Sequence, residues 1–401
     1  MRRVVPAAAA LWIGIGASAT AAAAPPAGLA ELPARALVLI ARGSGKILFA
    51  ERANDELPIA STTKLMTALV TVEREQAAAT LVEQPYTAGL GESLADVPAG
   101  GRLGLADMLR AMLLPSGNNV AYSLALDVGG TIPRFVSMMN GLAALLDLGR
   151  THFTTPIGLD TPGDNYSTAT DLARLARIVL RDPLIAKIVD QPSARLADGV
   201  VVHNRNDLVG AYRWVVGVKT GSTQDAGDCL VAAASLNGVH LISVVLGAPS
   251  EAARDADTLA LLRYGLSLFR SVPVAVAGRA YASVAVTGRS RRVRLIAKRS
   301  LRVVLARGVR LHVSRDGVPA RLLGPLRAGT VEGAIRVHEN GRVVQTVALV
   351  TAAAVPAPRP VVQQGALGWI AEGGGGLTVL VLGCSLPLMR RRAMRSVSGV
   401  Q

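Results

Sequence analysis

The chain has 401 residues, of which 50% are hydrophobic and only 3% aromatic, so its core must be built mainly from Ala, Leu and Val. This composition excludes intrinsic disorder for most of the chain, and the length excludes a single small module because domains typically hold roughly 100–200 residues. The formal charge of +15 is unevenly spread, since residues 1–270 carry a net −1 and residues 271–345 a net +12.

The N-terminus has the three parts of a secretory signal peptide. Two arginines follow Met1, an apolar run spans residues 4–17, and small residues end at Ala24 before a pair of prolines. This pattern is typical of a leader that is removed on export. We therefore expect residues 1–24 to be a signal peptide and the protein to be exported, which removes nucleic acid as a partner for its basic residues.

Residues 25–271 have the pattern of an α/β domain. Short β-prone runs lie at both ends of this segment, at 36–41, 47–51, 214–218, 229–236 and 239–246, and Asn237-Gly238 is a hairpin signal between the last two. Helical spacing of apolar residues covers 62–73, 105–113, 119–127, 132–146, 170–180 and 251–269. The predicted fold is an antiparallel sheet of about five strands with an inserted helical region.

Residues 272–350 change to an alternation of apolar and polar residues. The runs at 334–338 and 342–350 are joined through Asn340-Gly341, which predicts a hairpin within a small all-β domain. Arginines occupy the polar positions of these strands. Two interpretations of this face stay open: a solvated face that protects strand edges from pairing, or a face that binds an anionic surface.

The C-terminus has the pattern of a membrane tail. Residues 351–365 are expected to be a linker, stiffened by Pro356–Pro360. Residues 366–392 are expected to form a membrane anchor, because Gly373–Met389 is uncharged and Arg390–Arg392 follow it directly. A helix that lies in the membrane interface is the alternative. Either one leaves an exported, membrane-anchored protein with its body on the outer face.

Lysine is rare in this chain, and its placement indicates chemistry. Only five of the 43 cationic residues are lysine, and two of them lie in Ser61-Thr62-Thr63-Lys64 and Lys219-Thr220-Gly221. A desolvated lysine can act as a base near neutral pH, whereas an arginine cannot. Ser61 opens a predicted helix with Lys64 one turn later, so the alcohol would have a base within reach. A helix-capping serine beside an exposed lysine is the simpler interpretation of this motif alone.

Two further motifs accompany the first. Ser116-Gly117-Asn118 follows one predicted helix and precedes another, and Lys219-Thr220-Gly221 ends a predicted strand. The three motifs in this order are those of penicillin-binding proteins and active-serine β-lactamases. Over about residues 30–350 the chain resembles the low-molecular-mass penicillin-binding proteins of the D-alanyl-D-alanine carboxypeptidase type. Pro156–Asp160 and Tyr166–Asp171 are similar to further landmarks of that family, while Asn119 and Ser222 depart from residues that the family often has there.

The resemblance implies a serine-type carboxypeptidase that cleaves the D-Ala-D-Ala end of peptidoglycan stem peptides and that β-lactams inhibit covalently. Ser61 would be the nucleophile and Lys64 its base, with a pKa lowered by burial and by the positive charge of Lys219. Ser116 would relay a proton to the leaving amine, and the Asn118 amide would hold the substrate backbone.

The third motif would hold the substrate. Lys219 and Thr220 would face the terminal carboxylate, Gly221 would let the substrate lie close to the strand, and the backbone N–H groups of Ser61 and Ser222 would form the oxyanion hole. Arg254 is similar to a family arginine near that carboxylate. An arginine at a helix start that pairs with Asp255 or Asp257 is an equally open interpretation.

Rival functions depend on other residues. A class A β-lactamase needs a glutamate-activated water, and the sequence between Asn119 and Val218 contains no glutamate. DD-endopeptidase or transpeptidase activity stays open on the same fold, and a non-catalytic cell-wall binding protein would be expected to lack Lys64 or Ser116. The five histidines form no i, i+4 pair and the two cysteines lie far apart, so neither a metal nor a cofactor is expected.

Overall fold

A five-stranded antiparallel sheet forms the centre of the α/β body, by which we mean residues 31–268. The computed structural model describes residues 11–12, 28–29, 31–160, 165–339 and 341–358. The sheet order is β10-β11-β12-β2-β3. Its strands are β2 (Ala36–Ala41), β3 (Ile47–Glu51), β10 (Val215–Thr223), β11 (Gly227–Leu236) and β12 (Val239–Ala248). The prediction of about five strands from both ends of this segment is confirmed.

Strands β2, β11 and β12 are buried on both faces of the sheet, because their alternate residues enter different apolar clusters. In β2, Val38 and Ile40 pack in one cluster while Leu37 and Leu39 pack in the other. All six residues of β2 are buried. Strands buried on two sides appear in a sequence as continuous apolar runs, which is why these runs lack alternation.

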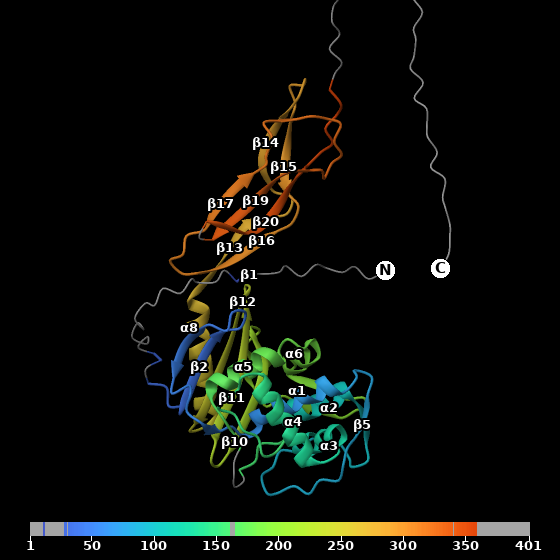
Figure 1. Ribbon diagram of the computed structural model, residues 1–401, viewed down its shortest axis with the longest axis vertical. Coiled ribbons are helices and arrows are strands. Elements are labelled where there is room, and N and C mark those ends of the chain that lie inside the picture. The colour runs from blue at the N-terminus through green and yellow to red at the C-terminus, as the bar shows by residue number, and fades with distance from the viewer. Residues whose placement is uncertain (1–10, 13–27, 30, 161–164, 340, 359–401) are drawn as a thin grey trace, which may run out of the picture. The chain divides into compact units, whose positions relative to one another are not determined.

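Helices cover the two faces, with α8 (Glu251–Ser267) on one side and most of the inserted helices on the other (Figure 1). The short inserted helix α7 (Leu208–Ala211) packs in the same cluster as α8. The inserted elements are η1 (Ala60–Thr63), α1 (Lys64–Arg74), α2 (Leu105–Leu113), α3 (Asn118–Gly129), α4 (Ile132–Leu145), α5 (Ala169–Val179), α6 (Pro183–Val189) and α7 (Leu208–Ala211). Apolar spacing predicted all of them except the two short helices α6 and α7. Asp182 caps α6 by accepting hydrogen bonds from the N–H groups of Leu184 and Ile185, with Pro183 at the first helical position. That cap was a local signal for α6.

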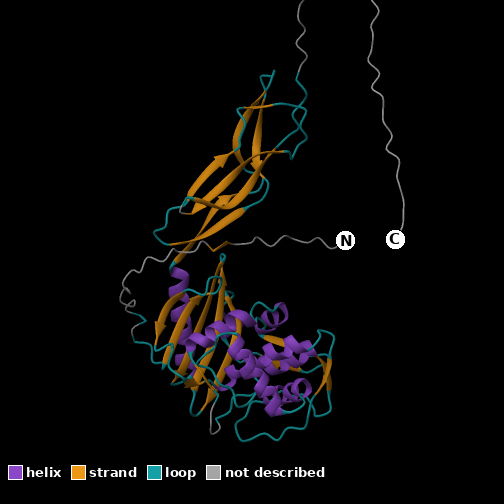
Figure 2. Cartoon of the chain, viewed as in Figure 1, coloured by secondary structure: helices purple, strands orange, loops and turns teal. Residues whose placement is uncertain are grey.

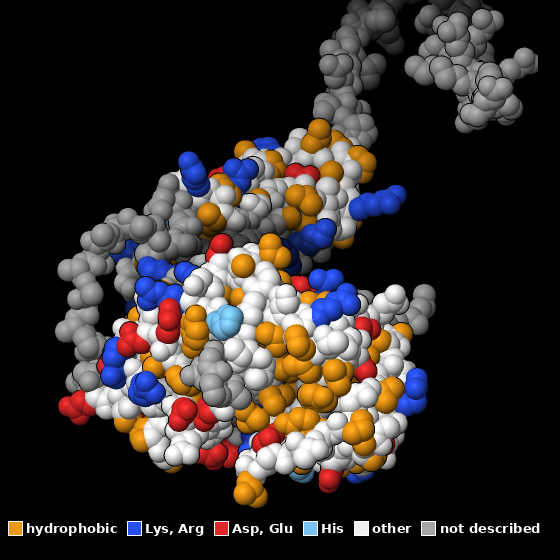
Figure 3. Space-filling view, turned by 60° about the horizontal axis from the view of Figure 1, so that its bottom comes forward, with side chains coloured by type: hydrophobic (Ala, Val, Ile, Leu, Met, Phe, Trp, Pro, Cys, Tyr) orange, Lys and Arg blue, Asp and Glu red, His pale blue; other side chains and the backbone are white. Residues whose placement is uncertain are grey.

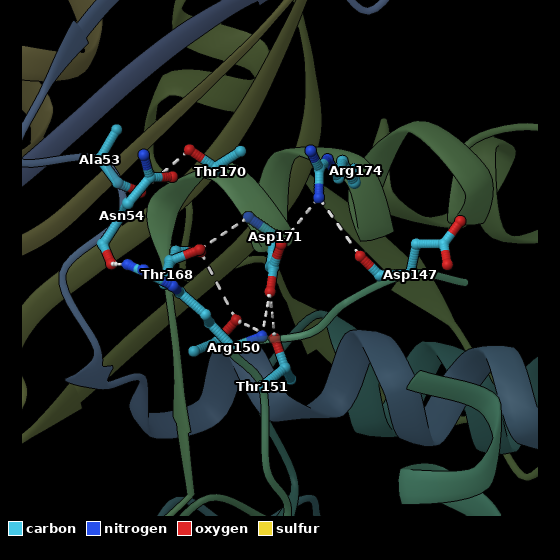
Figure 4. A network of polar contacts seen from close by, with 10 residues as sticks. Ala53, Asn54, Asp147, Arg150, Thr151, Thr168, Thr170, Asp171 and Arg174 are labelled. Atoms are coloured by element: carbon cyan, nitrogen blue, oxygen red, sulfur yellow. Dashed lines mark hydrogen bonds and ion pairs between the residues drawn. The ribbon is translucent and has the colours of Figure 1, made fainter. Parts of the chain in front are cut away.

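A polar network fixes the start of α5, which packs on β2 and β12 (Figure 4). Thr168 caps the helix, since its hydroxyl accepts from the Asp171 N–H at 3.0 Å. The Asp171 carboxylate, 4% exposed, accepts from the Arg150 N–H at 3.0 Å and pairs with Arg174 at 3.3 Å. The Tyr166–Asp171 landmark therefore anchors α5 to the loop that follows α4.

Three short ribbons border the helices. They are β4 (Leu57–Pro58) with β7 (Tyr166–Ser167), β5 (Thr80–Val82) with β6 (Arg102–Gly104), and β8 (Ser193–Arg195) with β9 (Val201–His203). The β4–β7 pair joins the segment before η1 to the start of α5. Residues 58–64, which contain Ser61 and which we call the nucleophile segment, are thus held next to a capped helix.

Residues 269–358, the β-rich body, contain strands and loops and no helix in the part that is described (Figure 2). Its strands are β13 (Phe269–Ala275), β14 (Ala280–Val286), β15 (Arg292–Ala297), β16 (Leu301–Ala306), β17 (His312–Asp316), β18 (Arg321–Leu322), β19 (Val331–Glu339) and β20 (Arg342–Thr351). Six form a sheet of order β17-β19-β20-β15-β14-β18, and β13 and β16 pair in a second sheet. The expected boundary between residues 271 and 272 falls inside β13.

In the β-rich body, exposed arginines and buried apolar residues alternate along the strand β15. Along β15 the side chains of Val293 and Leu295 are buried whereas Arg292 and Arg294 are exposed. In the space-filling view, basic side chains project from this body, while basic and acidic side chains are interspersed on the α/β body (Figure 3). The uneven charge of the sequence is thus an uneven surface charge.

The expected leader and anchor lie almost wholly outside the described residues. Of residues 1–24, only Leu11–Trp12 are described, as the short strand β1 beside β16. The expected anchor, residues 366–392, is not among the described residues. No helix within the described ranges has the length and apolar character needed to cross a bilayer.

Candidate active site

Ser61 and Lys64 meet at the junction of η1 and α1. Ser61 lies in η1, and Lys64 is the first residue of α1, so the two side chains are one helical turn apart. Lys64 Nζ and Ser61 Oγ form a hydrogen bond of 2.7 Å. The interpretation of Lys64 as an exposed surface lysine is wrong, because its side chain is completely buried.

The surroundings of Lys64 disfavour its charged form. Its Nζ also donates to Asn118 Oδ1 at 2.6 Å and to the Ile157 carbonyl at 3.0 Å. Burial, then the positive charges of Lys219 and Arg205, lower the pKa of Lys64 well below its usual value, against a smaller opposing effect of Glu92. A lysine with a lowered pKa can accept a proton near neutral pH.

The Pro156–Asp160 landmark fits tightly against the nucleophile segment. Gly158 has a φ of +84°, and a Cβ on it would lie 2.0 Å from the Ala60 carbonyl oxygen. Its neighbour Ile157 supplies the carbonyl that Lys64 contacts, and Thr67 Oγ1 donates to the Pro156 carbonyl at 2.6 Å. Glycine at 158 is therefore required for the backbone to reach the base.

The second motif lies between α2 and α3. Ser116 is 3% exposed and has a φ of +67°, an uncommon conformation for a serine that costs free energy and is often found at functional sites. A Cβ on Gly117 would lie 2.7 Å from the Ala111 carbonyl oxygen. Asn118 is the first residue of α3, and its Oδ1 faces the Lys64 amine. The loop thus brings Ser116 and Asn118 to the first motif.

The third motif lies inside β10 and not at the end of a strand. Lys219, Thr220 and Gly221 pair with β11 at Val231, Leu230 and Cys229. The β10–β11 pairing continues to Gly227, which extends the strand through these polar residues. A prediction based on apolar residues alone therefore ends this strand too early.

Gly221 allows the third motif to approach the first. A Cβ on it would lie 2.9 Å from the Ser61 backbone nitrogen and 3.1 Å from the Ile59 carbonyl oxygen. We expected this glycine to make room for substrate. In the structure it makes room for the backbone of the nucleophile segment, so its lack of a side chain sets the distance between β10 and Ser61.

Lys219 is buried behind the strand. Its Nζ donates to the Thr220 carbonyl at 2.9 Å, and its side chain is 1% exposed. Burial, followed by the positive charges of Arg205 and Arg254, lowers the pKa of Lys219 to about 7. A group with this pKa changes its charge within the physiological range.

A cleft of about 750 Å³ joins the three motifs. Of the predicted site residues, Ser61, Ser116, Thr220, Gly221, Ser222 and Arg254 line it. The remaining predicted residues, Lys64, Asn118 and Lys219, are buried and do not line the cleft. Hydroxyl and guanidinium groups thus face the cleft, while both lysines lie in the protein interior.

Arg254 forms the ion pair that one of the two interpretations of its position predicts. It lies in the first turn of α8, where its Nε donates to Asp255 Oδ1 at 2.9 Å. Asp257 instead accepts from the Ala34 N–H at 3.2 Å. Yet Arg254 is 2% exposed, lines the cleft and helps to lower the pKa of Lys219. The ion pair holds this guanidinium at the cleft.

Two site residues had not been predicted from the sequence. Glu92 lies in the loop between β5 and β6, where its carboxylate accepts from Asn118 Nδ2 at 2.8 Å, from the Gly89 N–H at 2.8 Å and from the Tyr86 hydroxyl. Burial raises the pKa of Glu92, but these hydrogen bonds and Lys64 outweigh it and keep the pKa below its usual value. No local pattern marks this glutamate, and it precedes the segment from Asn119 to Val218 in which a class A β-lactamase would carry its water-activating glutamate.

Arg205 is the second residue that had not been predicted. It lines the cleft, and its positive charge lowers the pKa values of both Lys64 and Lys219. Its only signal in the sequence was an arginine between two asparagines in the loop before β10. The neighbouring His203 also lines the cleft.

Comparisons with known proteins agree with this geometry. Residues 19–250 match the family model of D-alanyl-D-alanine carboxypeptidase, peptidase family S11. The chain is 31% identical over 330 residues to D-alanyl-D-alanine carboxypeptidase DacC of Escherichia coli, which covers 79% of this chain and 82% of that protein. It is 31% identical over 248 residues to the D-alanyl-D-alanine carboxypeptidase of Streptomyces sp. strain K15, covering 56% of this chain and 84% of that protein.

Solved structures lead to the same family. Penicillin-binding protein 5 from Haemophilus influenzae is 28% identical with a TM-score of 0.58, over 83% of this chain and 99% of that one. The Streptomyces K15 DD-transpeptidase is 30% identical with a TM-score of 0.55, over 59% of this chain and 98% of that one. The matched range contains all three motifs and Glu92. The chain therefore belongs to the D-alanyl-D-alanine carboxypeptidase family of serine peptidases.

Proposed function

We propose that this protein removes the terminal D-alanine from peptidoglycan stem peptides through an acyl-enzyme on Ser61, and so acts in cell-wall synthesis and remodelling. The observation that carries the proposal is the 2.7 Å contact between Ser61 Oγ and a completely buried Lys64 amine. An alcohol is a weak nucleophile until a base takes its proton. Burial and neighbouring cations supply that base.

The contacts of Lys64 fit a neutral amine. A neutral amine has two N–H bonds and one lone pair. The two N–H bonds can be donated to Asn118 Oδ1 and the Ile157 carbonyl, which leaves the lone pair for the Ser61 proton. Asn118 therefore orients the base, in addition to its role at the substrate backbone that the resemblance implies.

Acylation then proceeds with Lys64 as proton acceptor. Ser61 Oγ bonds to the carbonyl carbon of the penultimate D-Ala while its proton passes to Lys64. The bond to the terminal D-Ala nitrogen breaks, and that nitrogen leaves with a proton delivered through Ser116. Water hydrolyses the resulting ester and regenerates the Ser61 hydroxyl. Backbone N–H groups of Ser61 and Ser222 would stabilise the oxyanion, each donor being worth roughly 3–4 kcal/mol.

Specificity for a free carboxylate follows from the cations behind β10. Lys219 and Arg254 are both nine-tenths or more buried, and Thr220 lines the cleft beside them. Buried cations gain more from a carboxylate than exposed ones because the local dielectric constant is low. The substrate carboxylate would bind here and raise the pKa of Lys219, so that binding favours its charged form.

The test is covalent labelling by penicillin followed by turnover of a pentapeptide. Intact-mass analysis should show one adduct, located on the Ser61 peptide, and Ser61→Ala should form none. Lys64→Met should lower the acylation rate about 10²–10⁴-fold, the usual contribution of a general base. Lys46→Met, at an exposed lysine, is the matched control and should acylate normally. An adduct on another serine, or normal acylation of Lys64→Met, would contradict the proposal.

Transpeptidation is a second candidate, because the chain is also similar to the Streptomyces K15 DD-transpeptidase. The acyl-enzyme is common to both reactions, and the acceptor decides the product. Adding glycylglycine as an acceptor to the pentapeptide assay distinguishes the two reactions. Hydrolysis gives the tetrapeptide, and transfer gives a peptide extended by the acceptor. Tetrapeptide as the main product supports the carboxypeptidase.

We further propose that the protein works outside the cytoplasm, attached to the cytoplasmic membrane. The leader pattern in residues 1–24 and the apolar, Arg-flanked segment 366–392 support this location. Peptidoglycan stem peptides are found on that side of the membrane. Cell fractionation, with and without residues 359–401, tests the attachment.

A further inference from the structure

A second cavity lies at the end of the sheet opposite the cleft. It has a volume of about 370 Å³ and is lined by Arg42, Gly43, Arg177, Arg181 and His240. Ser222 pairs with Asp228, and Asp228 with Ala248, at the cleft end of the sheet. At the other end the Arg42 N–H donates to the His240 carbonyl. We call this cavity the arginine pocket.

The arginine pocket concentrates positive charge without a compensating carboxylate. No acidic residue lines it, and within the described residues none of its three arginines forms an ion pair. Burial and the like charge of Arg181 lower the pKa of Arg42. Gathering like charges in a half-buried site costs free energy that a bound anion would offset.

Two of the guanidinium groups are held in place by backbone carbonyls. Arg177 Nε donates to the Arg42 carbonyl at 2.7 Å, and its NH2 group donates to the Gly43 carbonyl at 2.9 Å. The Arg42 guanidinium donates to the carbonyl of Leu180, the C-cap of α5. Each guanidinium has five N–H donors, so both keep donors for a ligand.

Helix capping explains only part of this cluster. A cation at a helix C-terminus is stabilised by the helix dipole, which accounts for Arg42 and Arg177. Arg181 lies beyond the C-cap and is exposed, and within the described residues its guanidinium makes no hydrogen bond or ion pair, although its backbone N–H donates to the Ile178 carbonyl. Its guanidinium is free to bind a ligand in the pocket.

We propose that the arginine pocket binds a phosphoryl group, as a phosphate monoester or diphosphate. A dianion offsets several cations at once, and phosphoryl oxygens match the planar donor fork of arginine. A volume of about 370 Å³ is at the small end of the range of ligand pockets, roughly 300–1,000 Å³, and suits such a head group. The group could belong to a soluble molecule or to an anionic lipid. The site is separate from Ser61 and does not depend on its chemistry.

Calorimetric titration of the full chain with inorganic pyrophosphate, at about 150 mM NaCl to screen non-specific attraction, tests the proposal. Binding should be saturable with one site. Arg181→Gln should weaken it at least tenfold. Arg74→Gln is the matched control, since Arg74 is also an exposed arginine at a helix C-terminus and lies outside the pocket. It should change affinity less than twofold.

A second arm distinguishes the sources of the phosphoryl group. Co-sedimentation of residues 25–358, which lack the proposed anchor, with phosphatidylglycerol vesicles is compared between Arg181→Gln and Arg74→Gln, with and without pyrophosphate. Vesicle binding that pyrophosphate displaces and only Arg181→Gln weakens assigns the pocket to a lipid head group. Pyrophosphate binding without that vesicle dependence assigns it to a soluble phosphate. The absence of saturable pyrophosphate binding, or equal weakening by both variants, would overturn the proposal.

Discussion

Single side chains set the proton affinity of the base. Lys64 is surrounded by two cations that disfavour its ammonium form and by Glu92, which favours it. The carboxylate of Glu92 also holds Asn118, whose Oδ1 contacts the base. Glu92 is therefore a positioning residue for Asn118 and an electrostatic counterweight to Lys219 and Arg205.

Replacing Glu92 should shift the pH profile of acylation. Glu92→Gln removes the negative charge that raises the pKa of Lys64, so that pKa falls and the acid limb of the acylation rate should move to lower pH by roughly 0.5–1. A glutamine can still accept from Asn118. Stopped-flow acylation by a chromogenic β-lactam between pH 5 and 9 measures the limb. Glu75→Gln, at the C-cap of α1 and outside the cleft, is the control, and an unmoved limb would remove Glu92 from this role.

Lys219 should make substrate binding depend on pH. Its pKa is lowered to about 7, so it is charged below that pH and neutral above it. KM for a D-Ala-D-Ala peptide should therefore rise above pH 7, approaching roughly tenfold per pH unit once the charged form is rare. Lys219→Arg stays charged and should give a flat KM wherever thermal melting shows that it folds. Lys298→Arg, at an exposed lysine, should keep the wild-type curve, and a wild-type KM that is flat to pH 9 would contradict the assignment.

At the scale of elements, the site depends on the close approach of β10 to η1. Gly221 allows it, because both backbone atoms nearest to its missing Cβ belong to the nucleophile segment. Gly221→Ala must push that segment away and with it the Ser61 N–H. We expect acylation to fall about 10²–10³-fold, as on loss of an oxyanion donor, and stability to fall by about 1–3 kcal/mol from overpacking.

Gly149→Ala is the matched control for this change, since a Cβ at Gly149 would meet nothing within 4 Å. It should leave acylation and the melting temperature close to wild type. Acylation and thermal melting of both variants separate the two effects. If Gly221→Ala acylates normally, the contact between β10 and η1 does not set the geometry of Ser61.

Elements with a strong apolar pattern were predictable, and those whose shape depends on pairing were not. The apolar spacing gave α2 with its observed bounds, Leu105–Leu113, because its buried residues recur every three or four positions. The extent of β10 depends on its register with β11, which no local pattern records. The three motifs were recognisable because each one is local. Glu92 and Arg205 reach the site from loops, and only the tertiary fold brings them there.

At the scale of the whole molecule, the sheet separates two charged sites. The cleft lies at the end where β10 and β11 meet through Thr223 and Gly227, and the arginine pocket lies at the opposite end beside the β2–β3 turn. A ligand in the pocket can therefore attach the enzyme to its surroundings without obstructing the cleft. The two sites share no lining residue.

All residues that build the cleft lie between Ser61 and Arg254, so the C-terminal residues should be dispensable for chemistry. The described residues up to Pro358 form one compact unit. A shortened chain should end after Pro358 and not after Thr351, because Leu326 and Val355 form a β-bridge and Arg289 donates to the Ala357 carbonyl at 2.8 Å.

A chain of residues 25–358 should release D-Ala from a soluble pentapeptide at a rate within about twofold of the full-length protein. The binding energy used in the transition state comes from residues that this chain retains. This chain should also appear in the soluble fraction, whereas the full-length protein should sediment with membranes if residues 366–392 anchor it as we propose. A folded 25–358 chain that loses turnover on the small peptide would show that residues 359–401 contribute to the cleft, and one that still sediments would place the membrane attachment in the body.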